Sequence, residues 1–406
     1  AALAARLEPE GYAQLLSSVV RLLAKARRAE ADFRPALRGV VAVIKAFPYG
    51  ALEDASVARM VWRQLDARGA CVSEAAQAAG VLDGGEGGKG DGPPFSREDS
   101  SLLPPATAAY RGVALRVLPE LEQLLVVKEE VQPQVVLAIV EALVLFPAQA
   151  LRSRLTRVLQ PLANALKARA QHVRDSVRAV FVQVAARLGP AYLSAVLQVL
   201  VTACPARGYL AHVFSFSTHA VVAALRPQLL EANERQREAR KQEESAPEGG
   251  KTAEQRGKQA GASAPHPLDP CLRSLLLVIE RDLFGAVADA KEAAEFARLY
   301  AEAKQCKAYD LYEMLCECVD FGASFPSALA FSVDRLADVS SAKLRPKVLQ
   351  LLQRAMKGAL NNPSATAVDL CRFFYALADR GLAAEERARR RAAQASEAAV
   401  GLEEGM

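Results

Sequence analysis

The stretch Pro133-Gln-Val-Val-Leu-Ala-Ile-Val-Glu-Ala-Leu-Val-Leu-Phe-Pro147 decides the fold class of this sequence. It predicts an apolar helix that ends at Phe146-Pro147, because a residue that precedes a proline disfavours the α region. The segment Pro35-Ala-Leu-Arg-Gly-Val-Val-Ala-Val-Ile-Lys-Ala-Phe-Pro48 has nearly the same form. A comparable helix ends at Leu188-Gly189-Pro190, 43 residues after Pro147. This interval lies within the roughly 40 to 47 residues of a HEAT or armadillo unit, so the sequence predicts an all-α solenoid of stacked helical hairpins.

Two further segments have helical patterns. Residues Gly11 to Arg28 place apolar side chains at i, i+3 and i+4, and basic residues close the C-terminal end, as in an amphipathic helix. Residues Asp54 to Ala67 form another helix candidate. No segment alternates apolar and polar residues with period two over a useful length, so we expect no strands.

The composition of the whole chain fits a packed helical protein. Of 406 residues, 51% are hydrophobic and 24% are charged, near the average of folded soluble domains, which excludes a disordered or membrane-embedded chain. Only 6% are aromatic, and the abundance of Ala, Leu and Val favours many thin helix–helix interfaces over one deep core. The formal net charge of +5, from 51 Lys and Arg against 46 Asp and Glu, is compatible with an RNA neighbour and does not require one.

Two stretches interrupt the helical pattern. One surrounds the Gly- and Pro-rich run Asp83–Pro94, which contains no residue that can anchor a core and predicts a flexible loop. The other, residues 231–260, contains no Val, Ile, Leu, Met or aromatic residue, so we expect a charged disordered linker whose first half prolongs the preceding helix. The predicted units are N-terminal HEAT-like helices (1–72), a flexible loop (73–104), central HEAT repeats (105–230), a charged disordered linker (231–267), C-terminal HEAT-like helices (268–380) and a charged helical tail (381–406).

Cysteines and apolar runs bear on the cellular compartment. The seven cysteines are odd in number and include no CxxC pair, which predicts buried free thiols in a reducing compartment. Apolar runs such as 135–146 are far shorter than the roughly 18 residues that span a bilayer, so we expect no contact with a membrane. The chain begins without Met or a signal-peptide pattern, and we expect it to be an internal piece of a longer protein.

Two local patterns suggest a phosphate or metal site but fail its chemical requirements. In the run Gly84–Gly92, a phosphate-binding P-loop would need glycine where Asp83 stands and Ser or Thr where Gly90 stands. Cys316 and Cys318 are two residues apart on a predicted helix, so they lie on roughly opposite faces and cannot chelate one ion.

His212 and His219 are seven residues apart and share one helix face. No acidic residue lies between Leu210 and Gln228 to orient either histidine as a catalytic base. We therefore expect buried or partner-facing polar residues here. Across the chain we expect no catalytic residue, no cofactor, no metal site and no small-molecule substrate.

Two basic runs are candidate RNA-binding or partner-binding surfaces. The first comprises Arg152, Arg154, Arg157, Lys167 and Arg169, and the second comprises Arg387, Arg389, Arg390 and Arg391. Several bases that neutralise phosphates would give a steep salt dependence. The alternative is a solvated helix surface, balanced near the C-terminus by acids such as Glu385 and Glu386.

A series of short motifs carries a family resemblance. The first block contains His172-Val-Arg-Asp-Ser-Val-Arg178, Leu188-Gly-Pro-Ala-Tyr-Leu193, Arg207-Gly-Tyr-Leu-Ala-His-Val213 and Ser217-Thr-His219. The second block contains Asp282-Leu-Phe-Gly285, Ala290-Lys-Glu292, Glu302-Ala-Lys304 and Lys307-Ala-Tyr-Asp310. In this order the motifs resemble the very large HEAT-repeat component of the small-subunit processome, the family also called down-regulated in metastasis. The matching family-motif positions are Arg174, Asp175, Gly189, Tyr192, Arg207, Gly208, Tyr209, His212, His219, Asp282, Phe284, Gly285, Lys291, Glu292, Lys304, Tyr309 and Asp310.

This resemblance implies a non-enzymatic nucleolar scaffold that takes part in the processing of pre-ribosomal RNA and the assembly of the small ribosomal subunit. The implied partners are pre-ribosomal RNA, small nucleolar ribonucleoprotein and other small-subunit assembly factors. A runner-up from another class is a karyopherin-like transport adaptor that binds protein cargo. Such an adaptor should present ladders of Trp and Asn on its inner helices, and this chain has one Trp, at position 62. An enzyme is the third alternative, and no constellation of residues supports it.

Overall fold

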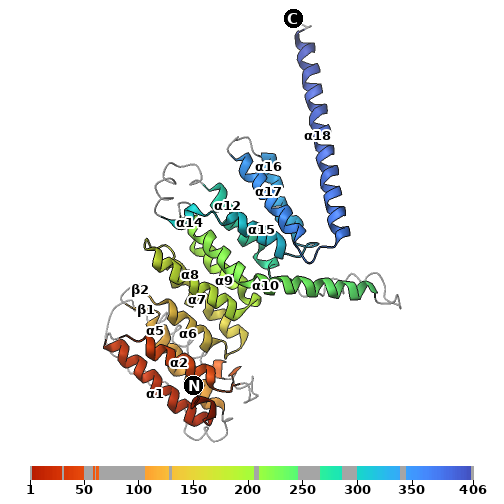
Figure 1. The fold of residues 1–406 in the computed structure, drawn as a ribbon. Helices are drawn as coiled ribbons and strands as arrows, with labels where there is room; N and C mark the ends of the chain where they lie inside the picture. The colour runs from red at the N-terminus through yellow and green to blue at the C-terminus, as the bar shows by residue number, and fades with distance from the viewer. Residues whose placement is uncertain are drawn as a thin grey trace, which may run out of the picture.

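The computed structural model describes residues 2–29, 32–49, 58–59, 61–63, 106–127, 130–204, 210–245, 266–285, 300–338 and 344–403. Two rows of helices stack side by side along the length of the molecule, from the N-terminus at one end to the C-terminal helix at the other (Figure 1). The first row contains α1 (Pro9–Arg28), α4 (Ala106–Gly112) with the π-helix η4 (Val113–Val117) and α5 (Leu118–Leu124), α7 (Ala148–Ala165), α9 (Leu193–Ala203), α12 (Leu272–Phe284) and α16 (Phe325–Asp338).

The second row lies against the first. It contains α2 (Arg34–Ala46), α6 (Pro133–Leu143), α8 (Gln171–Leu188), α10 (Leu210–Ser245), α15 (Ala308–Cys318) and α17 (Arg345–Leu360). In this row each helix packs against the next one, and sequence neighbours such as α1 and α2 or α16 and α17 also pack against each other across the rows. The chain is therefore an α-solenoid, and the predicted all-α fold class is confirmed. Short segments complete the array: η1 (Ala4–Arg6), η5 (Pro190–Tyr192), η6 (Asp269–Cys271) and α14 (Ala301–Lys304).

Proline turns separate one helical pair from the next. Helices α2, α6 and α8 all belong to the second row, and the predicted Phe-Pro, Phe-Pro and Gly-Pro turns follow them. Gly189 ends α8 with φ of 75°, a left-handed backbone that glycine adopts without steric cost. The 43-residue interval between Pro147 and Pro190 is the length of one structural unit, α7 plus α8.

The Phe-Pro turns also supply core side chains. Phe47 is buried and its ring stacks on Tyr12 with centroids 3.8 Å apart. Phe146 is buried beside Trp62 with centroids 5.4 Å apart. Tyr12 and Tyr49 share a buried hydrogen bond of 2.5 Å between their hydroxyl groups. These aromatic contacts fix the N-terminal hairpin, whereas most of the remaining core is Leu, Val and Ala, as expected for thin interfaces.

One local feature departs from the helical pattern. Val126–Val127 (β1) and Glu130–Val131 (β2) form a two-residue antiparallel pair between α5 and α6, although the sequence predicts no strands. Period-two patterning cannot reveal so short a pair, because it needs several residues to show. The pair is a local turn closure, and the fold class stays all-α.

Helix α10 runs to Ser245, which confirms the prediction that the first half of the charged segment 231–260 prolongs the preceding helix. Asn233 is fully buried, and its Nδ2 donates to the carbonyl oxygen of Cys318 at 2.9 Å. Asn362 donates to the carbonyl oxygens of Cys316 and Val319 at 2.9 and 2.7 Å. Two buried asparagines thus satisfy carbonyls at the C-terminal end of α15, where no helical partner remains.

The C-terminal helix α18 (Ala367–Glu403) is continuous across the predicted boundary at residue 380 and stands apart from the array (Figure 1). Its first turns are tied to the array by Phe373, whose ring packs edge-on against Phe325 and Phe321. Farther along, Tyr375 and Leu382 are exposed.

Several predicted features lie in parts of the chain that the structure does not describe. They include the Gly- and Pro-rich loop, most of the helix candidate Asp54 to Ala67, Cys71 and the linker beyond residue 245. No single described helix is long and apolar enough to span a membrane, and α8 followed by Pro190–Ala203 meets that criterion only as a pair bent by 115°.

Candidate functional site

The two motif blocks meet at a buried cluster of charges, which we call the Glu302 clamp. Arg174, in the first turn of α8, is fully buried, and its Nε and Nη2 donate to the two carboxylate oxygens of Glu302, both at 2.9 Å. Its Nη1 donates to the carbonyl oxygens of Ala168 and Arg169 at 3.0 and 2.8 Å. The guanidinium plane also lies 4.4 Å from the ring centroid of Tyr300. Each of the three guanidinium nitrogens donates at least one hydrogen bond, as burial of a charge requires.

Arg178, one helical turn later, adds a second cation to the clamp. Its Nη2 donates to Glu302 at 2.7 Å, and its Nη1 donates to Asp175 at 2.6 Å. Asp175 and Arg178 therefore form an i, i+3 ion pair on α8. Burial favours a higher pKa for Glu302, but the hydrogen bonds from Arg174 and Arg178 outweigh it and lower the pKa to about 2. Glu302 is therefore ionised at neutral pH.

A second cluster joins α10 to α12. His212 Nδ1 lies against the carboxylate of Asp282, which is buried. The thiol of Cys306 donates to the other carboxylate oxygen at 3.8 Å. The hydrogen bond to Asp282 raises the pKa of His212, against the opposing effect of burial. Burial and the charge of Asp282 raise the pKa of the Cys306 thiol to about 12, so the thiol is protonated and is no activated nucleophile.

The remaining described motif residues surround these two clusters. His219 has a lowered pKa, because partial burial disfavours its charged form and Lys307 lies nearby. Asp310 accepts from Lys307 at 2.8 Å and pairs with Arg354 of α17 at 3.2 Å. Burial raises the pKa of Tyr309 to about 12. These polar residues hold helices together and form no catalytic arrangement.

At two motif positions, steric constraints explain why the residue is glycine. Gly189 occupies the left-handed turn after α8 described above. A Cβ on Gly285, at the end of α12, would overlap the carbonyl oxygen of Arg281. Phe284 precedes it and lies 5.1 Å from the guanidinium of Arg335, whereas Lys304 is exposed. The motif residues Arg207, Gly208, Tyr209, Lys291 and Glu292 lie outside the described residues.

The first basic run contains one residue in an ion pair with another helix and four exposed residues. Arg154 has a structural role, because it pairs with Glu122 at 2.8 Å and its guanidinium lies 5.1 Å from the ring centroid of Trp62. Arg152 is exposed, 5.6 Å from the ring centroid of Tyr192, and Arg157 is exposed as well. Lys167 and Arg169 are exposed just after α7. Neither α7 nor the adjacent α9 contains an acidic residue, so the exposed bases of α7 have no acid on either helix.

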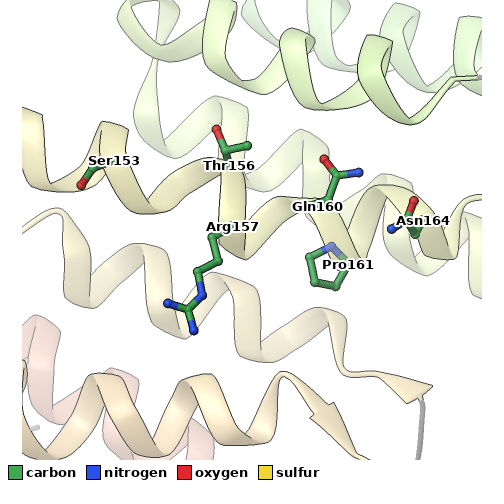
Figure 2. Close-up of a pocket in the computed structure, with 6 residues that line it drawn as sticks. All are labelled: Ser153, Thr156, Arg157, Gln160, Pro161 and Asn164. Atoms are coloured by element: carbon green, nitrogen blue, oxygen red, sulfur yellow. The ribbon is translucent and has the colours of Figure 1, made fainter. Parts of the chain in front are cut away.

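The outer face of α7 is polar and shallow. Figure 2 shows its lining residues, all from this one helix: Ser153, Thr156, Arg157, Gln160, Pro161 and Asn164. A surface made by one helix cannot enclose a small ligand. Hydroxyl, amide and guanidinium groups in a row do suit the phosphates and sugars of a nucleic acid backbone.

The second basic run lies on the exposed part of α18. Arg390 pairs with Glu386 at 2.5 Å, and Arg387 Nε donates to the carbonyl oxygen of Ala383 at 3.0 Å. Arg389 is exposed, and the side chain of Arg391 is outside the described residues. Part of this run is therefore balanced within its own helix.

Cysteines and metal-binding groups give no further site. Among the described residues, no group of three or more His, Cys, Asp or Glu could hold a metal ion. Cys316 and Cys318 are both buried, and burial raises the pKa of each thiol above its ordinary value. Cys371 is exposed, which the prediction of buried thiols did not foresee, because it lies on the outer face of α18.

The His212–Asp282 pair predicts a pH dependence. Because the folded-state pKa of His212 is raised, its stabilising effect is complete below the unfolded value near 6.5 and is lost as pH rises through the folded value. We expect hydrogen exchange in the first turns of α10 and in α12 to speed up, beyond its intrinsic rise, as pH rises above the ordinary histidine value near 6.5. His212→Gln should remove that dependence, and an unchanged dependence would contradict the assignment. Exchange in α1 and α2 serves as the control.

The fold and the site together define a class. This is a helical-repeat protein whose polar motif residues lock neighbouring helices, with an open basic face on α7. Residues 126–378 match the family model of the U3 small nucleolar RNA-associated protein 20 domain. The chain belongs to this family. The U3 small nucleolar RNA-associated protein 20 of Schizosaccharomyces pombe is 25% identical over 241 residues, which cover 59% of this chain and 8% of that protein.

Proposed function

We propose that this chain is a non-enzymatic scaffold segment of the nucleolar small-subunit processome and that it supports pre-ribosomal RNA processing and assembly of the small ribosomal subunit. The observation that carries the proposal is the family match over residues 126–378. That range contains both motif blocks and the Glu302 clamp that joins them. The proposed partners are pre-ribosomal RNA, small nucleolar ribonucleoprotein and other assembly factors.

The architecture suits a scaffold. Each helical pair touches only its neighbours, so a long array exposes much surface for its mass and makes many separate contacts. The clamp and the His212–Asp282 pair hold α8, α10, α12 and α14 in fixed relative positions. A fixed geometry lets contacts at distant points of the array act together.

A karyopherin-like adaptor has less support. Trp62 is 5% exposed and packs against Phe146 and Arg154. Asn233 and Asn362 are buried and bind the end of α15. Within the described helices, these residues therefore serve the core and present no ladder to cargo.

Depletion of the full-length protein tests the proposal. Cells that lack it should accumulate unprocessed precursors of the small-subunit RNA, measured by hybridisation, and recover when the wild-type protein is restored. A protein whose segment 126–378 is deleted should not restore processing, whereas Glu231→Gln, an exposed change on α10, should. Normal maturation after depletion would contradict the proposal.

Direct RNA contact on α7 is a finer part of the proposal. Each lost phosphate contact should lower the slope of log affinity against log salt by about 1. We expect Arg152→Ala with Arg157→Ala to reduce the slope for a structured RNA by about 1 to 2. The matched variant changes Arg389, Arg390 and Arg391 to Ala, and it tests the second run in the same titration. A slope that neither variant changes would assign both runs to solvent or to protein partners.

A further inference from the structure

A groove crosses the outer surface of three successive helices of the second row, α2, α6 and α8. Its volume is about 800 Å³. Each helix contributes one face with side chains three, four or seven residues apart. The lining residues are Leu37, Arg38, Val41, Ala42 and Lys45 of α2, Gln134, Leu137, Val140 and Glu141 of α6, and Ser176, Ala179, Val180, Gln183 and Arg187 of α8.

The floor of this groove is aliphatic. Val41 of α2 and Leu137 of α6 are half-buried, so part of each side chain faces the groove, and the buried Val180 of α8 also lines it. The outer face of α7 differs in its side chains, because five of its six lining residues carry a hydroxyl, amide or guanidinium group and the sixth is Pro161. An aliphatic floor gains from contact with another apolar surface, whereas a polar face does not.

The rim of the groove is basic. Lys45 and Arg187 both bind Glu141, at 3.0 Å each, and Arg38 forms no ion pair among the described residues. Three bases against one acid give the rim a net charge of +2. Because Glu141 is already shared by two bases, a ligand with carboxylates would meet cations that lack full compensation.

The chemistry favours a protein segment over RNA. No lining residue is aromatic, and unpaired bases bind proteins chiefly by stacking on aromatic rings. Neighbouring helices pack with axes about 8 to 10 Å apart, so α2 and α8 are separated by roughly 16 to 20 Å. That distance equals about three to four turns of an α-helix.

We propose that the groove across α2, α6 and α8 binds a short acidic amphipathic helix of a protein partner, with aliphatic anchors on Val41 and Leu137 and carboxylates on the basic rim. The anchors would follow i, i+3, i+4 and i+7 spacing, as in other helix-in-groove complexes. This inference goes beyond the scaffold function and stands or falls independently of it.

A designed peptide tests the groove on the full 406-residue chain. The fluorescent probe has about 14 residues, with leucine at i, i+3, i+4 and i+7 and glutamate on its other face, and binding is followed by anisotropy. Leu137→Glu should weaken binding at least about tenfold, as expected for loss of a central anchor. Arg38→Glu should weaken it about threefold or more through charge repulsion. Val41→Glu on α2 repeats the test if Leu137→Glu fails to fold by circular dichroism.

Matched controls separate the groove from general surface effects. Leu349→Glu replaces an exposed leucine of α17, and Arg273→Glu reverses an exposed charge of α12. Neither should change the affinity. The same peptide with lysine in place of glutamate should bind much more weakly.

Several outcomes would overturn the inference. They are absence of binding, equal affinity after Leu137→Glu, or equal binding of the lysine peptide. Displacement of the probe by a single-stranded RNA whose own binding is lost in Leu137→Glu would make the groove a nucleic acid site. A dimer seen by sedimentation and abolished by Leu137→Glu would make it a contact between two copies of this chain.

Discussion

Glu302→Gln should lower the free energy of unfolding by about 3 to 5 kcal/mol, the range for breaking a buried ion pair by removing one partner. The substitution keeps the shape of the side chain but removes the charge that faces Arg174 and Arg178. Arg174 is fully buried and cannot turn to solvent, so it would keep an uncompensated charge inside the protein. Urea unfolding, followed by circular dichroism, measures the change.

An exposed ion pair provides the control for Glu302→Gln. Glu231→Gln removes one partner of the exposed pair with Arg235 and should change the stability by less than about 0.5 kcal/mol. Hydrogen exchange should quicken at the start of α8, where Arg174 binds the carbonyls of Ala168 and Arg169. A loss of stability no larger than that of Glu231→Gln would contradict the role of the clamp.

The clamp also predicts an acid-sensitive component of stability. Because the folded-state pKa of Glu302 is lowered to about 2, its contribution is present above the ordinary value of 4.5 and is lost as pH falls through the folded value. The wild-type protein should lose stability over this window more steeply than Glu302→Gln. Equal pH profiles would show that other carboxylates dominate acid unfolding.

The repeat pattern of the fold is readable in the sequence because its signals are local. Phe47-Pro48 and Phe146-Pro147 end second-row helices, and the same phenylalanines fill the core beside Tyr12 and Trp62. A proline acts on the residue that precedes it, so its effect needs no knowledge of distant contacts. The family motifs were likewise visible as ordered strings.

The partners inside the site are not readable in the same way. Arg174 and Glu302 are 128 residues apart, and only the fold, which packs both α8 and α14 against α10, brings them together. The residues next to Arg174 and Glu302 in the sequence are those expected around a solvent-exposed position on a helix. Arg174 lies near the start of a helix, directly before Asp175 and Ser176, so its sequence neighbours give no sign that it is buried.

The extension of α10 past residue 231 is predicted from the sequence, but the contact that holds its start against the array is not. A stretch without Val, Ile, Leu, Met or aromatic residues normally cannot offset the entropy of ordering. Here the buried Asn233 donates to a carbonyl at the end of α15, so a polar contact ties the start of the extension to the packed array. A prediction based on amino-acid composition considers apolar surface and does not include hydrogen bonds of this kind.

Gly358→Ala is the second change with a large expected effect. In the middle of a helix, alanine is favoured over glycine by about 1 kcal/mol, so propensity alone predicts stabilisation. In α17, however, a Cβ at this position would overlap the carbonyl oxygen of Glu313 and lie 2.7 Å from Cβ of Cys316 and 3.0 Å from the backbone nitrogen of Glu317. Two of these three atoms belong to the backbone of α15 and cannot rotate away.

The steric cost should therefore exceed the gain in propensity. Overpacking costs about 1 to 3 kcal/mol when side chains can adjust, and more when helices must separate. We expect Gly358→Ala to destabilise the protein by about 2 kcal/mol or more, measured by urea unfolding, with faster hydrogen exchange in α15 and α17.

Gly39→Ala is the matched control, because Gly39 also lies inside a helix. Its added Cβ would meet only Cγ1 of Val19, at 3.6 Å, an ordinary contact. This variant should gain about 0.5 to 1 kcal/mol. If Gly358→Ala lowers the free energy of unfolding and Gly39→Ala raises it, the packing of α15 against α17 depends on the absence of a Cβ at position 358. Stabilisation by both variants would contradict the close approach of α15 and α17 at Gly358.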